Sequence, residues 1–141
     1  MTTIILAALL LASESKVKLE SLPAAVQAAV KEQTRDAKLV GLSKENEDGQ
    51  TMYEVETTVN GKSRDLLLDK SGTVVEVEEE VGIDTIPSPA RDAIQKKAGS
   101  GKIKRVERVT KGTATSYEAA YVNKFGKTSE FAVNADGSVH K

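Results

Sequence analysis

The chain repeats itself after 64 residues, and this repetition constrains the fold more than any other feature of the sequence. Leu22-Pro23 matches Ile86-Pro87 at that offset. After one inserted residue the offset becomes 65, and Gly61-Lys62 then matches Gly126-Lys127. The matched positions are prolines, turn glycines and alternating apolar residues, which specify a fold. The sequence therefore predicts two tandem copies of one structural unit.

Each copy has the pattern of one helix followed by four strands. The predicted helices begin at Ser21 with Pro23 in the first turn, and at Ser88-Pro89, where a serine cap and a proline suit a helix start. Asn60-Gly61 predicts a tight hairpin turn, because both residues tolerate positive φ. Alternating apolar and polar residues predict the strands, namely 38–46, 51–59, 62–69 and 73–81 in the first copy, and 102–110, 115–123, 127–134 and 138–141 in the second.

The fold class that follows is α+β. Two tandem α-β-β-β-β repeats are expected to form an antiparallel sheet of about eight strands with both helices on one face. A unit of about 60 residues buries little apolar surface alone, which favours one continuous sheet. The predicted segments are a signal peptide at 1–15, a linker at 16–21, repeat 1 at 22–81, a linker at 82–85 and repeat 2 at 86–141.

The segment Ile4–Ala12 is an unbroken apolar run of nine residues. It is too short for a membrane-spanning helix, which needs about 20 apolar residues, and it has the length of the apolar region of a signal peptide. The alternative is a buried N-terminal strand or helix. We predict an exported, periplasmic or secreted protein with no stable membrane insertion after signal removal.

The pattern of helices, strands and turns resembles that of a known family. The helices opening with Leu22-Pro23 or Ile86-Pro87, the Tyr53-Glu54-Val55 strand and the Asp69-x-x-Gly72-x-Val74 turn resemble the PepSY-like repeat of small exported bacterial proteins. Its fold is similar to the repeats of the beta-lactamase inhibitor protein. The resemblance covers about Leu22–Lys141 and implies a fold. It carries no set of functional residues to positions in this chain, although the family name comes from propeptides that inhibit peptidases.

The sequence offers little material for catalysis. The chain has no Cys and a single His, His140, which excludes thiolate chemistry and multi-histidine metal centres. No nucleophile elbow, phosphate loop or dinucleotide-binding glycine pattern is present. We therefore predict no catalytic residues, no cofactor and no enzymatic activity.

Charge divides sharply between the two halves. Residues 22–81 hold 7 Lys+Arg and 13 Asp+Glu, a net charge of −6, and residues 86–141 hold 11 and 5, a net charge of +6. Lys104, Arg105 and Arg108 form the basic centre and are candidate binding residues, with a solvated strand face as the alternative. Stacking aromatic residues are absent from this stretch, so no nucleic acid is expected as a partner.

The acidic centre consists of Glu76, Glu78 and Glu80. Alternation places these three carboxylates on one face of a strand, about 7 Å apart. They are the chain's candidate metal ligands. However, calcium takes six or more oxygens from converging segments, so a solvated sheet face is favoured and no metal site is predicted.

Tyr53, Tyr117 and Tyr121 are three of the five aromatic residues. Exposed tyrosines are typical of binding surfaces, but their alternation with apolar residues favours positions in the core. We predict a non-enzymatic binding module for a protein of the cell envelope or outside the cell, with inhibition of an enzyme as one form. The helix-free sheet face or a hairpin tip, at Asn60-Gly61 or Phe125-Gly126, would dock. The alternatives are a small-ligand or metal-ion sensor and a structural envelope protein.

Overall fold

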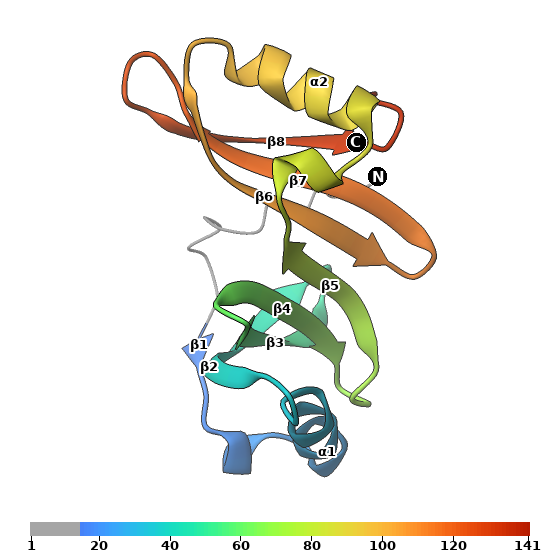
Figure 1. The fold of residues 1–141 in the computed structure, drawn as a ribbon. Coiled ribbons are helices and arrows are strands. Elements are labelled where there is room, and N and C mark those ends of the chain that lie inside the picture. Colours follow the sequence, from blue (N-terminus) through green and yellow to red (C-terminus); the bar gives the residue numbers. More distant parts are fainter. Residues whose placement is uncertain (1–14) are drawn as a thin grey trace. The chain divides into compact units, whose positions relative to one another are not determined.

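The structure of the protein is a computed structural model, which describes residues 15–141 (Figure 1). Two α-helices accompany eight strands that form an antiparallel sheet in sequence order, β1 to β8. The predicted α+β class is confirmed. The elements are β1 Ser15–Lys16, the 3-10 turn η1 Leu19–Ser21, α1 Ala24–Gln33, β2 Lys38–Glu47, β3 Gln50–Val59, β4 Lys62–Asp69, β5 Val74–Glu80, the 3-10 turn η2 Ile83–Thr85, α2 Ser88–Ala98, β6 Lys102–Lys111, β7 Ala114–Val122 and β8 Thr128–Asn134.

The described residues divide into two compact units, which we call the first unit (residues 15–78) and the second unit (residues 79–141). In the first unit, α1 contributes Val26 and Val30 to a core that also contains Val55, Leu66 and Leu68. These five side chains are at most 1% exposed. The helix thus covers one face of β2, β3 and β4 and leaves their other face free of helix.

The second unit repeats this arrangement with its own core. Ile94 and Ala90 of α2 pack against Val106, Ala119 and Val133, which come from β6, β7 and β8 in that order. The three strands lie side by side beneath the helix (Figure 1). The core is built from aliphatic side chains and alanine, with Tyr117 and Phe131 at its margin.

Both helices begin after a proline, and the predicted serine caps are wrong. Pro23 and Pro87 occupy the N-cap positions with ψ of 145° and 138°, and neither helix has a side-chain capping hydrogen bond. The Ser21 hydroxyl instead donates to the Lys18 carbonyl oxygen within η1, and Ser88 is already the first residue of α2. A proline disfavours helical backbone in the residue before it, and Leu22 and Ile86 are extended, with ψ of 158° and 160°. Each proline thus helps to define where its helix begins.

The eighth strand differs from the predicted one. Residues 138–141 form only an isolated bridge between Val139 and Val133. The strand count is completed by β1, in which Ser15 and Lys16 pair with Lys44 and Ser43 of β2. A strand therefore lies at the start of the segment that the sequence predicts as a linker. The predicted signal peptide, residues 1–15, lies outside the described residues apart from Ser15.

The entry into each unit is built in the same way. The Val17 amide donates to the Leu42 carbonyl oxygen at 3.0 Å, and the Val81 amide, 64 residues later, donates to the Val106 carbonyl oxygen at 2.9 Å. Val17 packs against the first core and Val81 against the second. Each donor directly precedes a short 3-10 turn and a helix, so the structural equivalence begins before Leu22.

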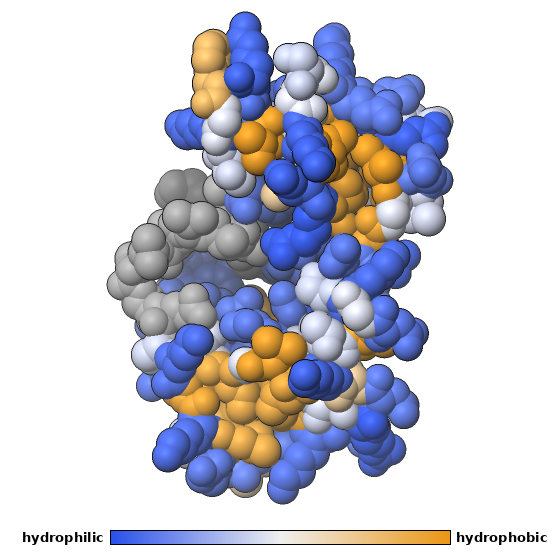
Figure 2. All heavy atoms as spheres, turned by 60° about the vertical axis from the view of Figure 1, so that its left-hand side comes forward, coloured by the Kyte–Doolittle hydropathy of each residue, from blue (hydrophilic) through white to orange (hydrophobic). Residues whose placement is uncertain are grey.

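Hydrophilic residues cover much of the visible surface of each unit and surround apolar areas (Figure 2). Within residues 15–141, neither helix is long and apolar enough to cross a membrane. Four large apolar side chains in the described part of the chain are exposed, namely Leu39, Val40, Phe125 and Val139.

Candidate functional site

The most exposed of these apolar side chains is Phe125, which is 83% exposed. It lies in the turn between β7 and β8, one of the positions that the sequence predicts as a docking tip. A phenylalanine side chain buries 150–250 Å² when it enters an apolar environment. Most of the Phe125 side chain stays exposed to solvent, so its apolar surface is available for an intermolecular contact.

The turn that carries Phe125, residues Asn123–Lys127, is called the hairpin tip below. The Asn123 side chain stabilises this turn, because its Oδ1 accepts hydrogen bonds from the backbone N–H groups of Phe125 (2.9 Å) and Lys127 (3.0 Å). The Asn123 carbonyl oxygen accepts a further bond from the Gly126 amide, and the Asn123 amide donates to the Lys127 carbonyl oxygen, both at 2.9 Å. Gly126 has φ +78°, a conformation that glycine adopts without strain.

One cation lies beside the exposed ring, and a second lies on the same turn. The ammonium nitrogen of Lys124 lies 5.0 Å from the centroid of the Phe125 ring, a cation–π distance. Lys124 and Lys127 are both exposed. The hairpin tip therefore combines one apolar anchor with two cations.

The three tyrosines do not form a contact patch. Tyr53 and Tyr121 are 7% and 8% exposed, and Tyr117 packs partly buried against the second core. Tyr53 belongs to the first core. The structure thus places these side chains in the cores, the alternative that their alternation favours.

The basic candidate residues do not come together on one surface. Arg105 Nε lies 3.1 Å from Glu107 Oε1, and Arg108 Nη2 lies 2.6 Å from Glu79 Oε2. Arg105 stands opposite Ala120 on the helix-free face, whereas Arg108 stands opposite Tyr117 on the other face. The hydrogen bonds and charge of Glu79 raise the pKa of Arg108. Both arginines are thus partly neutralised within the second unit.

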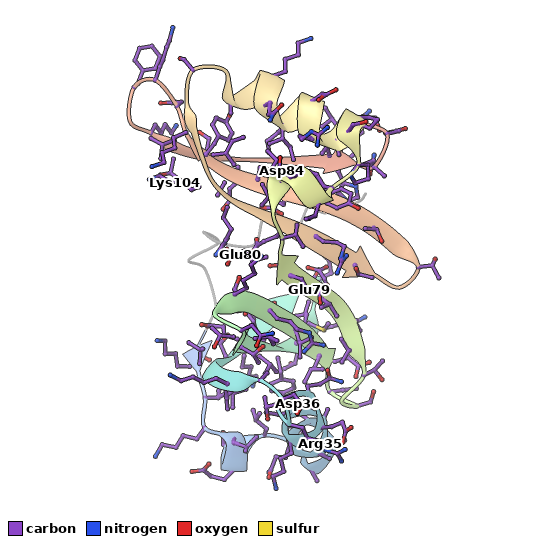
Figure 3. The ribbon with its side chains drawn as sticks, in the orientation of Figure 1. Arg35, Asp36, Glu79, Glu80, Asp84 and Lys104 are labelled. Atoms are coloured by element: carbon purple, nitrogen blue, oxygen red, sulfur yellow. The ribbon has the colours of Figure 1, made fainter. Side chains whose placement is uncertain are left out.

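Lys104 is exposed at an irregularity of β6, where the register shifts between Ile103 and Arg105. Figure 3 shows Lys104 on β6, and Glu79 and Glu80 at the end of β5. Lys104 thus adds to the positive surface of the second unit without joining either arginine pair.

The acidic candidate residues are more buried than side chains on a solvated sheet face would be. Glu76 is only 5% exposed, and Glu78 and Glu80 are half-buried. Glu76 and Glu78 belong to the first unit and Glu80 to the second. Within residues 15–141, no group of three or more His, Cys, Asp or Glu side chains is arranged to hold a metal ion.

The helix-free face of the second unit carries three glutamates whose burial the sequence analysis missed. Glu107 and Glu118 stand directly opposite each other on β6 and β7 and are 5% and 7% exposed. Glu130 of β8 lies opposite Ala120, which is also the partner of Arg105. The Glu130 Oε2 atom is buried and has no hydrogen-bond partner. Burial raises the pKa of Glu130 above its usual 4.5, and the charge of Arg105 opposes this shift.

We expect Glu130→Gln to raise the melting temperature at pH 7 by about 2 °C. In the folded protein the pKa of Glu130 lies above its unfolded value. Between the unfolded and the folded pKa of Glu130, the native state therefore binds more protons than the unfolded state. The free energy of unfolding falls as pH rises through this range. At pH 7 the ionised carboxylate is desolvated, and glutamine removes that penalty. Thermal melts between pH 4 and pH 8 should show the gain shrinking toward pH 4.

Asp136→Asn is the matched control, because its pKa is shifted the other way. Hydrogen bonds from the Ser138 hydroxyl and amide lower the pKa of Asp136 from 3.8. The stability that Asp136 contributes is present above pH 3.8 and is lost as pH falls through the lower folded value. Asp136→Asn should therefore lower the melting temperature at pH 7. If Glu130→Gln also lowers it, Glu130 stabilises the fold as an anion and our account of its burial is wrong.

Three solved structures show what the fold is similar to. A predicted periplasmic protein of Bacteroides eggerthii superposes with a TM-score of 0.69 at 15% identity, covering 85% of this chain and 86% of that one. A DUF2874 family protein of Bacteroides uniformis has a TM-score of 0.66 at 17% identity, covering 84% and 86%. A BLIP-like protein of Bacteroides fragilis has a TM-score of 0.57 at 16% identity, covering 83% and 82%. At these identities the likeness establishes a shared fold.

No protein-family model and no curated protein matches the sequence. The fold is thus shared with BLIP-like and DUF2874 proteins, and the site has to be argued from this chain's own residues.

Proposed function

We propose that the protein is an exported, non-enzymatic binding module that recognises another protein through the hairpin tip. The observation that carries the proposal is the 83% exposure of Phe125 on a turn fixed by the Asn123 side chain. A rigid aromatic residue lowers the entropy lost on binding, and aromatic anchors commonly dominate the energy of protein interfaces.

Two further observations support this function. The apolar run Ile4–Ala12 has the length of a signal-peptide core, and a structural neighbour is a predicted periplasmic protein. Another neighbour is BLIP-like. The periplasm is the compartment that we assign, and inhibition of an envelope or secreted enzyme is the more specific form of the proposed function.

The organisation of the chain is part of the same proposal. We assign residues 22–81 and 86–141 to two PepSY-like repeats, and the matching cores that α1 and α2 form with the strands of their own unit support this assignment. The equivalent of Phe125 in the first repeat is Asn60, at an offset of 65. Only the second repeat thus places an aromatic residue at this hairpin, which gives the two units different surfaces.

Capture from an envelope extract of the producing cell tests the function. We expect a protein to be recovered with the wild type and its yield to fall at least about tenfold with Phe125→Ala, because an interface anchor contributes about 2 kcal/mol or more. Quantitative mass spectrometry of the captured proteins measures this ratio.

Lys62→Ala is the control, since Lys62 lies at the corresponding hairpin of the first unit and is exposed. It should retain the captured protein. If no protein distinguishes the wild type from Phe125→Ala, at low or moderate salt, the proposed function is wrong.

A further inference from the structure

We propose that the partner presents an apolar pocket with an acidic rim, into which the hairpin tip inserts Phe125. This inference rests on the proposed function and adds the chemistry of the partner. It follows from three features of the hairpin tip: the shape of the turn, the position of its cations and the charge of the unit that carries it.

The shape of the hairpin tip favours insertion over flat contact. Phe125 is far more exposed than the other large apolar side chains in residues 15–141, since the next, Val40 and Val139, are 58% and 57% exposed. A single protruding ring offers little area to a flat surface. It buries most of its area only when the partner surrounds it, and anchors of this kind occupy pockets at the centres of interfaces.

The position of the cations defines the rim of that pocket. Lys124 Nζ lies 5.0 Å from the ring centroid, so inserting the ring brings this ammonium group to the mouth of the pocket. Lys127 is bound through its amide to the same Asn123 side chain, which keeps it on the same turn. Desolvated ammonium groups need carboxylates or water as partners. A rim of Asp and Glu side chains satisfies both lysines.

The net charge of the second unit also favours a partner with an acidic rim. The second unit, residues 79–141, holds 11 Lys+Arg and 8 Asp+Glu, a net charge of +3, and the two arginines nearest the middle of β6 are already paired with Glu107 and Glu79. The cations of the hairpin tip therefore lie in a unit of like charge. Such a field steers an acidic partner toward the tip and speeds association at low salt.

An anionic membrane is the other surface that attracts an aromatic residue flanked by lysines. One ring and two lysines give only weak, reversible membrane association, since stable anchoring needs further apolar groups or a larger basic cluster. The hairpin tip carries no second apolar side chain between Asn123 and Thr128. An acidic protein pocket is therefore the better fit.

The test begins with a photo-cross-linking amino acid at position 125 of the full chain in the producing cell, which identifies the contacted protein. The affinity of that purified protein is then measured for the wild type and for the double variant Lys124→Glu/Lys127→Glu. We expect the double variant to bind at least about tenfold more weakly. Raising NaCl from about 50 mM to about 300 mM should weaken wild-type binding several-fold.

A matched double variant, Lys62→Glu/Lys70→Glu, reverses two exposed lysines of the first unit and should bind within about twofold of the wild type. Co-sedimentation with vesicles of equimolar phosphatidylglycerol and phosphatidylethanolamine forms the second arm, and no Phe125-dependent binding is expected.

The outcomes separate this inference from the function on which it rests. A partner that requires Phe125 but is indifferent to Lys124→Glu/Lys127→Glu and to salt overturns the acidic rim and leaves the protein-binding function standing. Vesicle binding that Phe125→Ala abolishes, without a cross-linked protein, overturns both in favour of a lipid surface. Loss of affinity in the lysine variant, with the control unchanged, supports the acidic pocket.

Discussion

Replacing Gly72 by alanine should lower the free energy of unfolding by about 3 kcal/mol or more. Gly72 lies in the turn between β4 and β5 with φ +82°, where a side chain is strained. A Cβ atom at this position would lie 2.5 Å from the backbone oxygen of Ala25, in the first turn of α1. The helix or the turn would have to move, because the clashing atom belongs to the backbone. Denaturant unfolding of the variant measures the loss.

Gly61→Ala separates the backbone strain at Gly72 from the clash of its added Cβ atom with α1. Gly61 has nearly the same φ, +79°, but a Cβ atom added there would meet no other atom within 4 Å. This variant suffers the backbone strain alone and should lose about 1 kcal/mol. Equal losses for Gly61→Ala and Gly72→Ala would show that the contact with the helix is unimportant.

The second unit offers an independent repetition of the Gly72 experiment. Gly137 has φ +84°, and a Cβ atom there would lie 2.6 Å from the backbone oxygen of Pro89 in α2. Pro89 follows Ala25 by 64 residues, and Gly137 follows Gly72 by 65. Gly137→Ala should therefore destabilise by a similar amount. The turn glycines thus matter in both units because they allow a turn to lie against a helix.

The sequence predicts the two helices and most of the strands because their signals are local. Apolar alternation marks β3 and β4, and the Asn60-Gly61 turn adopts the predicted positive φ at both residues, 52° and 79°. β1 could not be predicted in this way. It is two residues long and is defined by its pairing with Ser43 and Lys44, which a local pattern does not contain.

A register irregularity near the start of each unit's first long strand was missed although its signal is present. Leu39 and Leu42 are three residues apart, so strict alternation would place them on opposite faces. The register shift between Leu39 and Gly41 brings both onto the helix side, opposite Thr57 and Val55. Ile103 and Val106 show the same spacing around the shift in β6. Apolar residues three apart within a strand pattern could have revealed both irregularities.

The candidate site was predicted only in part. Phe125-Gly126 predicts the turn between β7 and β8 and marks it as a docking tip, but the hydrogen bonds of the Asn123 side chain do not follow from the sequence pattern. The burial of Glu107 and Glu118 does not follow from the sequence. Alternation gives the face on which a glutamate lies, but its exposure depends on side chains of other strands. The charge pattern predicts one basic centre that contains Arg105 and Arg108, but their odd spacing on a strand sends the two side chains to opposite faces.

Ile94→Ala should lower the free energy of unfolding by about 3 kcal/mol, within the range measured for buried Ile→Ala changes. Ile94 is 1% exposed and packs between α2 and the strands of the second unit, where Val106, Ala119 and Val133 are its core neighbours. The substitution removes buried methyl and methylene groups, and the surrounding strands cannot close the cavity without breaking their pairing. Denaturant unfolding with an unchanged m-value would assign the loss to the folded state.

Two variants on the same helix calibrate this result. Ile94→Val removes one methylene group and should lose about 1 kcal/mol, and Gln95→Ala, at an exposed position, should change stability by less than about 0.5 kcal/mol. A loss for Gln95→Ala as large as that for Ile94→Ala would place the effect in the helix itself. The hairpin tip is fixed by hydrogen bonds within Asn123–Lys127. Ile94→Val should therefore leave partner binding at the wild-type level, which separates the stability of the core from the recognition by Phe125.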